Sequence, residues 1–179
     1  MNIFVPYLDP KRCAQALDNK RLNKMIVETG QILSTAMRTL NSPYSPPYGS
    51  FNPKHPCCIW AAQSRENFIW LTRLLNELLI EKKFRYPHSK PHSIEFTKYT
   101  FELFAMGHFD FPSEDRTEFP NCTNDKRLNI DFRYVPEVHK AYQQYLIFKW
   151  LRGKTKPSWG RRGQPEFFTE VRKSLGMEY

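Results

Sequence analysis

The sequence predicts a mainly α-helical protein, built as a single compact domain of about five helices with two long loops. The chain has 179 residues, of which 40% are hydrophobic and 15% aromatic, which suffices for one substantial core. Apolar residues recur at helical spacing in several segments. Proline opens these segments and glycine often follows them, as is typical of helix starts and ends. The sequence contains no pair of alternating strands, Gly-rich phosphate loop or internal repeat.

Two long helices are predicted first, at residues 10–39 and 56–86. At 100° per residue, each has apolar residues that fall on the side expected to face the core. For the first helix these residues are Leu22, Met25, Ile26, Thr29, Ile32, Leu33 and Ala36. For the second they are Ile59, Trp60, Phe68, Leu71, Leu75, Leu78 and Leu79.

Three shorter helices are predicted at residues 91–106, 136–153 and 165–175. Each begins at a proline, and Gly107 and Gly176 stand just beyond the first and last of them. The inward-facing residues of the middle helix are expected to be Val138, Ala141, Tyr142, Tyr145 and Phe148. The last helix is the shortest of the five.

The connections between these helices are of two kinds. Residues 41–55 are rich in proline and aromatic residues, which predicts a stiff, extended loop. Residues 110–135 form a second long connection, of a length that is often functional in compact domains. Residues 2–5 are expected to form a short strand or an extended arm. We expect a helical core domain at 1–153 and a basic, aromatic C-terminal segment at 154–179, packed on the same domain.

The excess positive charge lies at the two ends of the chain. The net charge is +9, and residues 61–148 contribute none of it. Residues 149–162 carry six basic residues, two tryptophans and no acidic residue. Basic side chains suit phosphates and aromatic faces suit unstacked bases, which indicates nucleic-acid binding. Alternatively, this segment is a solvated helix end whose tryptophans return to the core. The candidate nucleic-acid-binding residues here are Lys149, Arg152, Lys154, Trp159, Arg161 and Arg162.

The sequence gives no indication of a membrane span or a secretory signal. The longest apolar stretch, residues 68–80, is interrupted by Arg73, Asn76 and Glu77. Residues 1–8 have no basic start and contain Pro6. The four cysteines do not suit a disulfide framework. We therefore expect reduced thiols and a cytoplasmic location.

His55, Cys57 and Cys58 stand close together in the sequence and are candidate metal ligands. Adjacent cysteines do not easily reach one tetrahedral zinc ion, and no second ligand pair follows at the usual spacing. We therefore expect no metal and no cofactor.

A row of polar residues borders the apolar stripe of the first helix: Arg21, Lys24, Glu28 and Gln31. Arg21 and Glu28 are two turns apart, roughly 10 Å along the axis, which is too far for a direct pair. At the margin of the core and near basic residues, the Glu28 carboxylate is a candidate acid, base or electrostatic group. Equally, Lys24 and Glu28 could form an ordinary i,i+4 ion pair on a solvated flank.

Residues 17–33 read LDNKRLNKMIVETGQIL, and His55-Pro56 and Trp60 follow. This arrangement resembles a group of small bacterial and phage proteins and, more distantly, the phage-type pyrimidine-dimer DNA glycosylases. Those enzymes share a compact all-α fold, and their first helix carries a His-Leu pair followed by a glutamate. Arg21-Leu22 and Glu28 occupy the matching positions here. The resemblance covers the N-terminal third of the chain.

The resemblance implies a DNA-repair glycosylase with possible AP-lyase activity. In that family the N-terminal α-amine attacks C1′ of the damaged nucleotide to form an imine, and the helix glutamate stabilises the developing positive charge. Carried over, the catalytic residues are Met1 through its amine, Glu28 and Arg21, which replaces the family's histidine. Val27 and Gln31 stand where the family has arginines. A different modified base, or glycosylase chemistry without an imine, therefore stays open.

The expected partner is double-stranded DNA with a flipped base, bound by a monomer. Lys24, Gln31, His55 and Trp60 are expected to line the site, with Trp60 stacking on a base or filling its gap. Alternatively, Trp60 belongs to the core. Two other functions remain open: a DNA- or RNA-binding protein without catalysis, and an enzyme that acts on free nucleotides or a protein partner.

Overall fold

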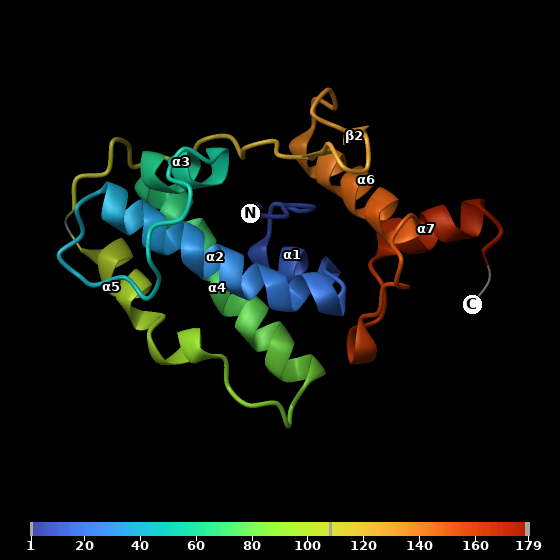
Figure 1. The fold of residues 1–179 in the computed structure, drawn as a ribbon, viewed down its shortest axis with the longest axis horizontal. Coiled ribbons are helices and arrows are strands. Elements are labelled where there is room, and N and C mark those ends of the chain that lie inside the picture. The colour runs from blue at the N-terminus through green and yellow to red at the C-terminus, as the bar shows by residue number, and fades with distance from the viewer. Residues whose placement is uncertain (1, 108, 178–179) are drawn as a thin grey trace.

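The computed structural model describes residues 2–107 and 109–177, which form a mainly helical fold (Figure 1). The helical prediction is confirmed, but the described residues form seven α-helices instead of five. They are α1 (Pro10–Ala16), α2 (Asn19–Thr39), α3 (Pro56–Gln63), α4 (Arg65–Arg85), α5 (Tyr99–Met106), α6 (Val138–Leu151) and α7 (Glu166–Ser174). Two 3₁₀ turns, η1 (Ser93–Phe96) and η2 (Gly160–Arg162), and a hairpin of β1 (Asn124–Asp125) and β2 (Ile130–Asp131) complete the fold.

The helix predicted at 10–39 is interrupted at Leu17 and Asp18, whose backbones are extended. The Asp18 carboxylate is buried and accepts hydrogen bonds from Arg21 Nη1 at 2.8 Å and Trp150 Nε1 at 2.9 Å. An aspartate before a helix is a common N-cap, but here its side chain accepts no backbone N–H of α2 and binds the side chains of Arg21 and Trp150 instead. The interruption therefore serves a tertiary contact.

The helix predicted at 56–86 is interrupted at Ser64, which is extended. The Ser64 hydroxyl accepts the N–H of Asn67 at 3.1 Å and so caps α4. The Asn67 side chain donates to the Trp60 carbonyl at 2.8 Å, near the end of α3. These bonds satisfy helix-end groups that burial would otherwise leave unpaired.

Helix burial follows the predicted stripes closely. All seven predicted core residues of the first long helix are buried in α2. In the second, Ile59 is 55% exposed; it lies in α3, which the break at Ser64 separates from α4. In α6, Val138 and Phe148 are only half-buried. Among the described helices, none has the length and apolar character needed to cross a membrane.

Residues 2–5 form an extended arm through the middle of the molecule, between α2 and α6, and bends at residues 6–9 lead from it into α1 (Figure 1). Ile3 and Val5 are completely buried. Helix α6 holds the arm from the other side: His139 Nδ1 lies 2.7 Å from the Val5 carbonyl, and Gln143 Nε2 donates to the Pro6 carbonyl at 2.9 Å. The expected extended arm is thus observed, and it places Asn2 against α2.

The loop at 41–55 is pinned to α2 by two buried hydroxyls. Ser34 accepts the N–H of Tyr48 at 3.2 Å, and Thr35 accepts the N–H of Phe51 at 3.0 Å. Gly30 permits this close packing, because a Cβ at its position would overlap the side chains of Ile94 and Tyr48.

The long connection at 110–135 contains the short hairpin, which the sequence did not predict. Its two strands are only two residues long, too short to show alternation. Asn124 pairs with Asp131, and Asp125 pairs with Ile130. The hairpin is attached to α6 by Lys149, whose ammonium lies 2.7 Å from Asp125 Oδ2.

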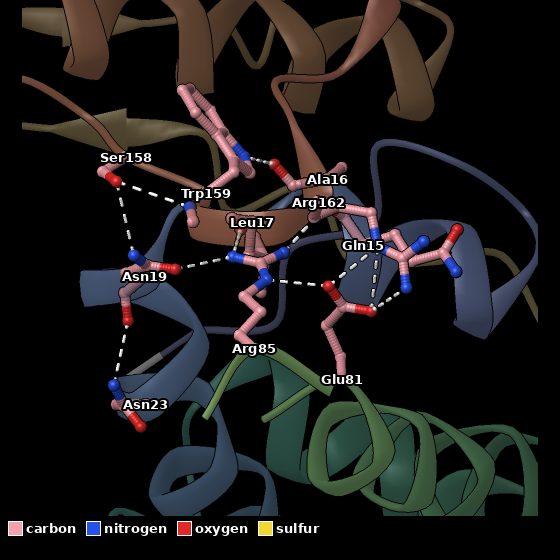
Figure 2. Close-up of polar contacts among 11 residues, drawn as sticks. Gln15, Ala16, Leu17, Asn19, Asn23, Glu81, Arg85, Ser158, Trp159 and Arg162 are labelled. Atoms are coloured by element: carbon pink, nitrogen blue, oxygen red, sulfur yellow. Dashed lines mark hydrogen bonds and ion pairs between the residues drawn. The ribbon is translucent and has the colours of Figure 1, made fainter. Parts of the chain in front are cut away.

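The segment that follows α6 returns to α1, α2 and α4 through the polar network shown in Figure 2. Arg85 is buried and donates to the Leu17 carbonyl at 2.7 Å, the Gln15 carbonyl at 3.0 Å and Glu81 Oε1 at 2.7 Å. Arg162 donates to Glu81 Oε2 at 2.8 Å from the opposite side. Burial raises the pKa of Glu81, but the hydrogen bonds from both arginines outweigh this and hold the pKa below its usual range.

Candidate functional site

A cleft of about 510 Å³ lies beside the end of the N-terminal arm. Its walls come from the arm, the first turns of α2, the start of α3, the hairpin and α6. The lining residues are Asn2, Phe4, Lys20, Arg21, Lys24, His55, Pro56, Cys122, Asn124, Asp125, Tyr145 and Lys149. Four of them are basic and one is acidic, so the cleft favours an anionic ligand.

Glu28 lies next to this cleft, in contact with two of its lining residues. The N–H of Asn2 donates to Glu28 Oε2 at 3.1 Å, and Lys24 Nζ lies 3.3 Å from Oε1. The Glu28 side chain is 13% exposed, whereas that of Lys24 is 60% exposed. The predicted i,i+4 ion pair therefore exists, but its acidic member is mostly withdrawn from solvent instead of lying on a solvated flank.

The first described residue, Asn2, is held at this carboxylate through its main-chain nitrogen. Met1, the nucleophile that the resemblance implies, lies outside the described residues.

The basic residues of the cleft differ in how they are paired. Arg21 is bound to the buried Asp18, and Lys149 is bound to Asp125. A hydrogen bond from Lys149 lowers the pKa of Asp125. Lys20 and Lys24 are exposed at the rim. The two lysines are thus the cleft cations most accessible to a phosphate.

One wall of the cleft contains a cluster of sulfur and nitrogen groups. Sγ of Cys57 and Sγ of Cys122 are 3.9 Å apart, and the Asn2 side chain donates to the Cys122 carbonyl at 3.0 Å. The hydrogen bond with Cys57 lowers the pKa of Cys122, while the same bond, together with burial, raises the pKa of Cys57. Sequence analysis missed Asn2 and Cys122, because no spacing links them to Cys57.

Several predicted site residues lie elsewhere. The Trp60 ring is 3% exposed and packs against Trp70 and Phe119, in keeping with the core interpretation. Trp159 is also buried, and its Nε1 donates to the Ala16 carbonyl at 2.8 Å. Arg162 binds Glu81. Neither tryptophan offers an exposed face on which a base could stack.

The remaining candidates are exposed or half-buried but do not line the cleft. Arg152, Lys154 and Arg161 are exposed around the end of α6 and η2. Arg152 stands over the Phe148 ring, with its guanidinium carbon 4.5 Å from the ring centre. Gln31 is half-buried one turn beyond Glu28. Of the predicted residues, the cleft therefore gathers Arg21, Lys24, His55 and Lys149, with Glu28 behind them.

Comparison with known proteins identifies the class of this arrangement. Residues 1–93 match the family of pyrimidine dimer DNA glycosylases. The match covers about half of the chain and includes the arm, Arg21, Lys24, Glu28 and His55. The protein belongs to this family, a class of DNA-repair glycosylases, and the resemblance seen in the sequence is confirmed. No curated protein and no solved structure matches the chain significantly.

Proposed function

We propose that the protein removes a damaged or modified base, of the pyrimidine-dimer class, from double-stranded DNA. In this proposal Glu28 is the catalytic carboxylate and the amine of residue 1 is the nucleophile. The observation that carries the proposal is the 3.1 Å hydrogen bond between the Asn2 amide and Glu28, beside a basic cleft. It brings the amino end of the chain and a largely buried carboxylate to one place.

The chemistry requires a neutral amine, and an ordinary α-amine with a pKa of roughly 7.7–8.0 supplies an appreciable neutral fraction at physiological pH. The amine nitrogen bonds to C1′, and the glycosidic bond breaks, so that the base leaves with the bonding electrons and takes up a proton. Loss of a proton from nitrogen and opening of the sugar ring, with protonation of O4′, then gives the imine. In this proposal Glu28 accepts the amine proton and stabilises the cationic species.

The cleft suits a flipped nucleotide in size and charge. Its volume of about 510 Å³ falls within the range of roughly 300–1,000 Å³ that is usual for small-molecule sites. Lys20 and Lys24 at the rim supply cations for the flanking phosphates. Arg21 is held by Asp18 and Lys149 by Asp125, which keeps two more guanidinium or ammonium groups in fixed positions. In this proposal Arg21 orients the nucleotide in place of the family's histidine.

The test uses duplex DNA that carries a pyrimidine dimer, with and without borohydride. Wild-type protein should break the glycosidic bond of one pyrimidine of the dimer, whose base stays joined to its neighbour, and, with borohydride, become covalently attached to the DNA through the reduced imine. Glu28→Gln should lower the rate of glycosidic-bond cleavage by about 10²–10⁴-fold, the usual contribution of a positioned acid or base. Glu66→Gln removes an exposed carboxylate on α4 and is the matched control, expected to retain full activity.

Three outcomes would contradict parts of the proposal. Full activity of Glu28→Gln would remove Glu28 from the mechanism. Base release that survives chemical blocking of the α-amine would exclude the imine and indicate direct hydrolysis. Salt-dependent DNA binding with no base release from dimer-containing or other modified DNA would leave a binding protein without catalysis.

A further inference from the structure

The cluster of His55, Cys57 and Cys122 has no part in the reaction proposed above. A ring nitrogen of His55 and the two Sγ atoms all lie within 4.8 Å of one another. The three residues come from two places in the chain, the start of α3 and the long connection at 110–135. We propose that these three side chains bind one zinc ion.

The spacing of the two sulfur atoms agrees with tetrahedral zinc. Zinc–sulfur bonds of about 2.3 Å at the tetrahedral angle place two thiolates about 3.8 Å apart. The observed separation of Cys57 Sγ and Cys122 Sγ is 3.9 Å. A disulfide needs a separation of about 2.05 Å, so the two sulfur atoms would have to approach much further. The thiols therefore stand almost at the distance that a shared ion requires.

The donor set also favours zinc over harder cations. Two thiolates and one imidazole are typical zinc ligands, and a site with three protein ligands leaves the fourth position for another donor. Asn2 is suited to that position, because its Oδ1 is 3.7 Å from Cys57 Sγ. Asn2, His55 and Cys122 all line the cleft, so a water molecule from the cleft could take the same place.

His55 is the ligand with a competing partner. Its Nδ1 accepts the N–H of Cys57 at 3.2 Å and thereby caps α3. Zinc binding through Nδ1 would exchange this hydrogen bond for the metal, which reduces the net gain from the imidazole. The thiolates should therefore contribute more to affinity than His55 does.

The ion would add a direct link between the start of α3 and the part of the long connection that precedes the hairpin. Cys122 stands just before the hairpin, in a segment with little regular structure, whereas Cys57 is buried in the first turn of α3. Asn2 already touches both through its amide, which donates to the Cys122 carbonyl and accepts from Cys57. A zinc ion here would fix one wall of the cleft and the end of the arm together. Cys122 lies outside the matched residues 1–93, so the complete site depends on the second half of this chain.

The test measures metal content, independently of activity. The full chain, kept reduced, is loaded with Zn²⁺, desalted and assayed for bound zinc, and the Co²⁺ form is examined for thiolate-to-cobalt charge-transfer absorption. We expect one ion per chain and an absorption intensity typical of two thiolates. Cys122→Ser and Cys57→Ser should each lower the affinity by more than about 100-fold, since loss of a second-shell partner alone costs roughly 10–100-fold. His55→Ala should lower it less.

Cys58→Ser and Cys13→Ser are the matched controls, because each removes a buried thiol outside the cluster and should leave binding unchanged. Circular dichroism of each variant separates loss of a ligand from loss of the fold. The proposal is overturned if the folded, reduced protein binds no zinc, if Cys122→Ser binds it as well as the wild type, or if Cys57 and Cys122 form a disulfide in preference to binding the ion. None of these results would bear on base excision.

Discussion

Two carboxylates in this protein are each approached by basic side chains, but with different results. Glu81 is enclosed by Arg85 and Arg162, and the Arg85 side chain is 0% exposed. Glu28 is approached by a backbone amide and by Lys24, whose side chain is largely exposed. In the first arrangement the arginines are paired with the buried carboxylate, whereas in the second the cations face an open cleft.

The comparison explains why basic residues near the C-terminus are poor guides to a binding surface. Arg162 belongs to the same run of basic residues as Lys154 and Arg161 in the sequence, yet its guanidinium is used to attach η2 to α4. Cationic residues become available to a ligand when their acidic partners are absent or already shared. Within the cleft, Lys20 and Lys24 are the cations most exposed to solvent.

The largest effect is expected from Glu81→Gln. It leaves Arg85 buried without its counter-charge, which typically costs about 3–5 kcal/mol of the free energy of unfolding. Urea denaturation followed by circular dichroism measures this loss. Asp131→Asn breaks an exposed ion pair with Arg133 and is the control, with no resolvable change expected. Equal stability of Glu81→Gln and wild type would show that the network is not structural.

The next effect concerns DNA binding at the cleft. Lys20→Ala combined with Lys24→Ala removes two accessible cations, so the slope of log affinity against log salt should become shallower by about 1.8, at roughly 0.9 per phosphate contact. The comparison variant combines Lys154→Ala with Arg161→Ala, both exposed but outside the cleft. A larger change in the comparison variant would place the DNA near the end of α6.

Acid stability should reveal the contribution of Glu81. Because the pKa of folded Glu81 is held below its usual range, its contribution to stability is complete above the ordinary carboxyl range. That contribution is lost as the pH falls through the lowered pKa of the folded protein, below about pH 4. Unfolding measured between neutral pH and pH 3 should therefore show a smaller acid loss in Glu81→Gln than in wild type. If the free energy of unfolding fell equally with pH in both proteins, the loss of stability in acid would be due to other groups, including Asp125.

The smallest effect is expected from Trp159→Phe. This change removes the hydrogen bond to the Ala16 carbonyl, worth about 1 kcal/mol, while keeping most of the packing. Thermal denaturation measures the loss. Affinity for duplex DNA should be unchanged because the ring is buried; a clear loss of affinity would restore the stacking role that the sequence suggested.

The sequence predicts local features of this fold well and distant contacts poorly. The α2 stripe follows from helical spacing alone, and all of its predicted members are buried. Both helix breaks stand at residues that commonly cap helices, Asp18 and Ser64, but continuous apolar periodicity on either side hides them. The break at Asp18 is stabilised by the hydrogen bond from Trp150, which is 132 residues away in the chain.

The candidate site also combines local features that the sequence predicts with distant contacts that it does not. Glu28 and Lys24 could be predicted as neighbours because a helix places residues four apart on one face. The approach of Asn2 to Glu28, and of Cys122 to Cys57, depends on how α6 and the long connection return to the N-terminal half. Trp159 and Arg162 are predicted to bind nucleic acid, with a return of the tryptophan to the core as the alternative, because composition does not indicate which basic and aromatic side chains find partners inside.

The buried arm has a consequence for biosynthesis. Its residues are made first, but the groups that hold Val5 and Pro6 belong to α6, at positions 139 and 143. Contacts this distant in sequence form late and slow the search for the native state. A ribosome must therefore translate most of the message before Asn2 can settle beside Glu28, and nascent chains released early should lack this contact.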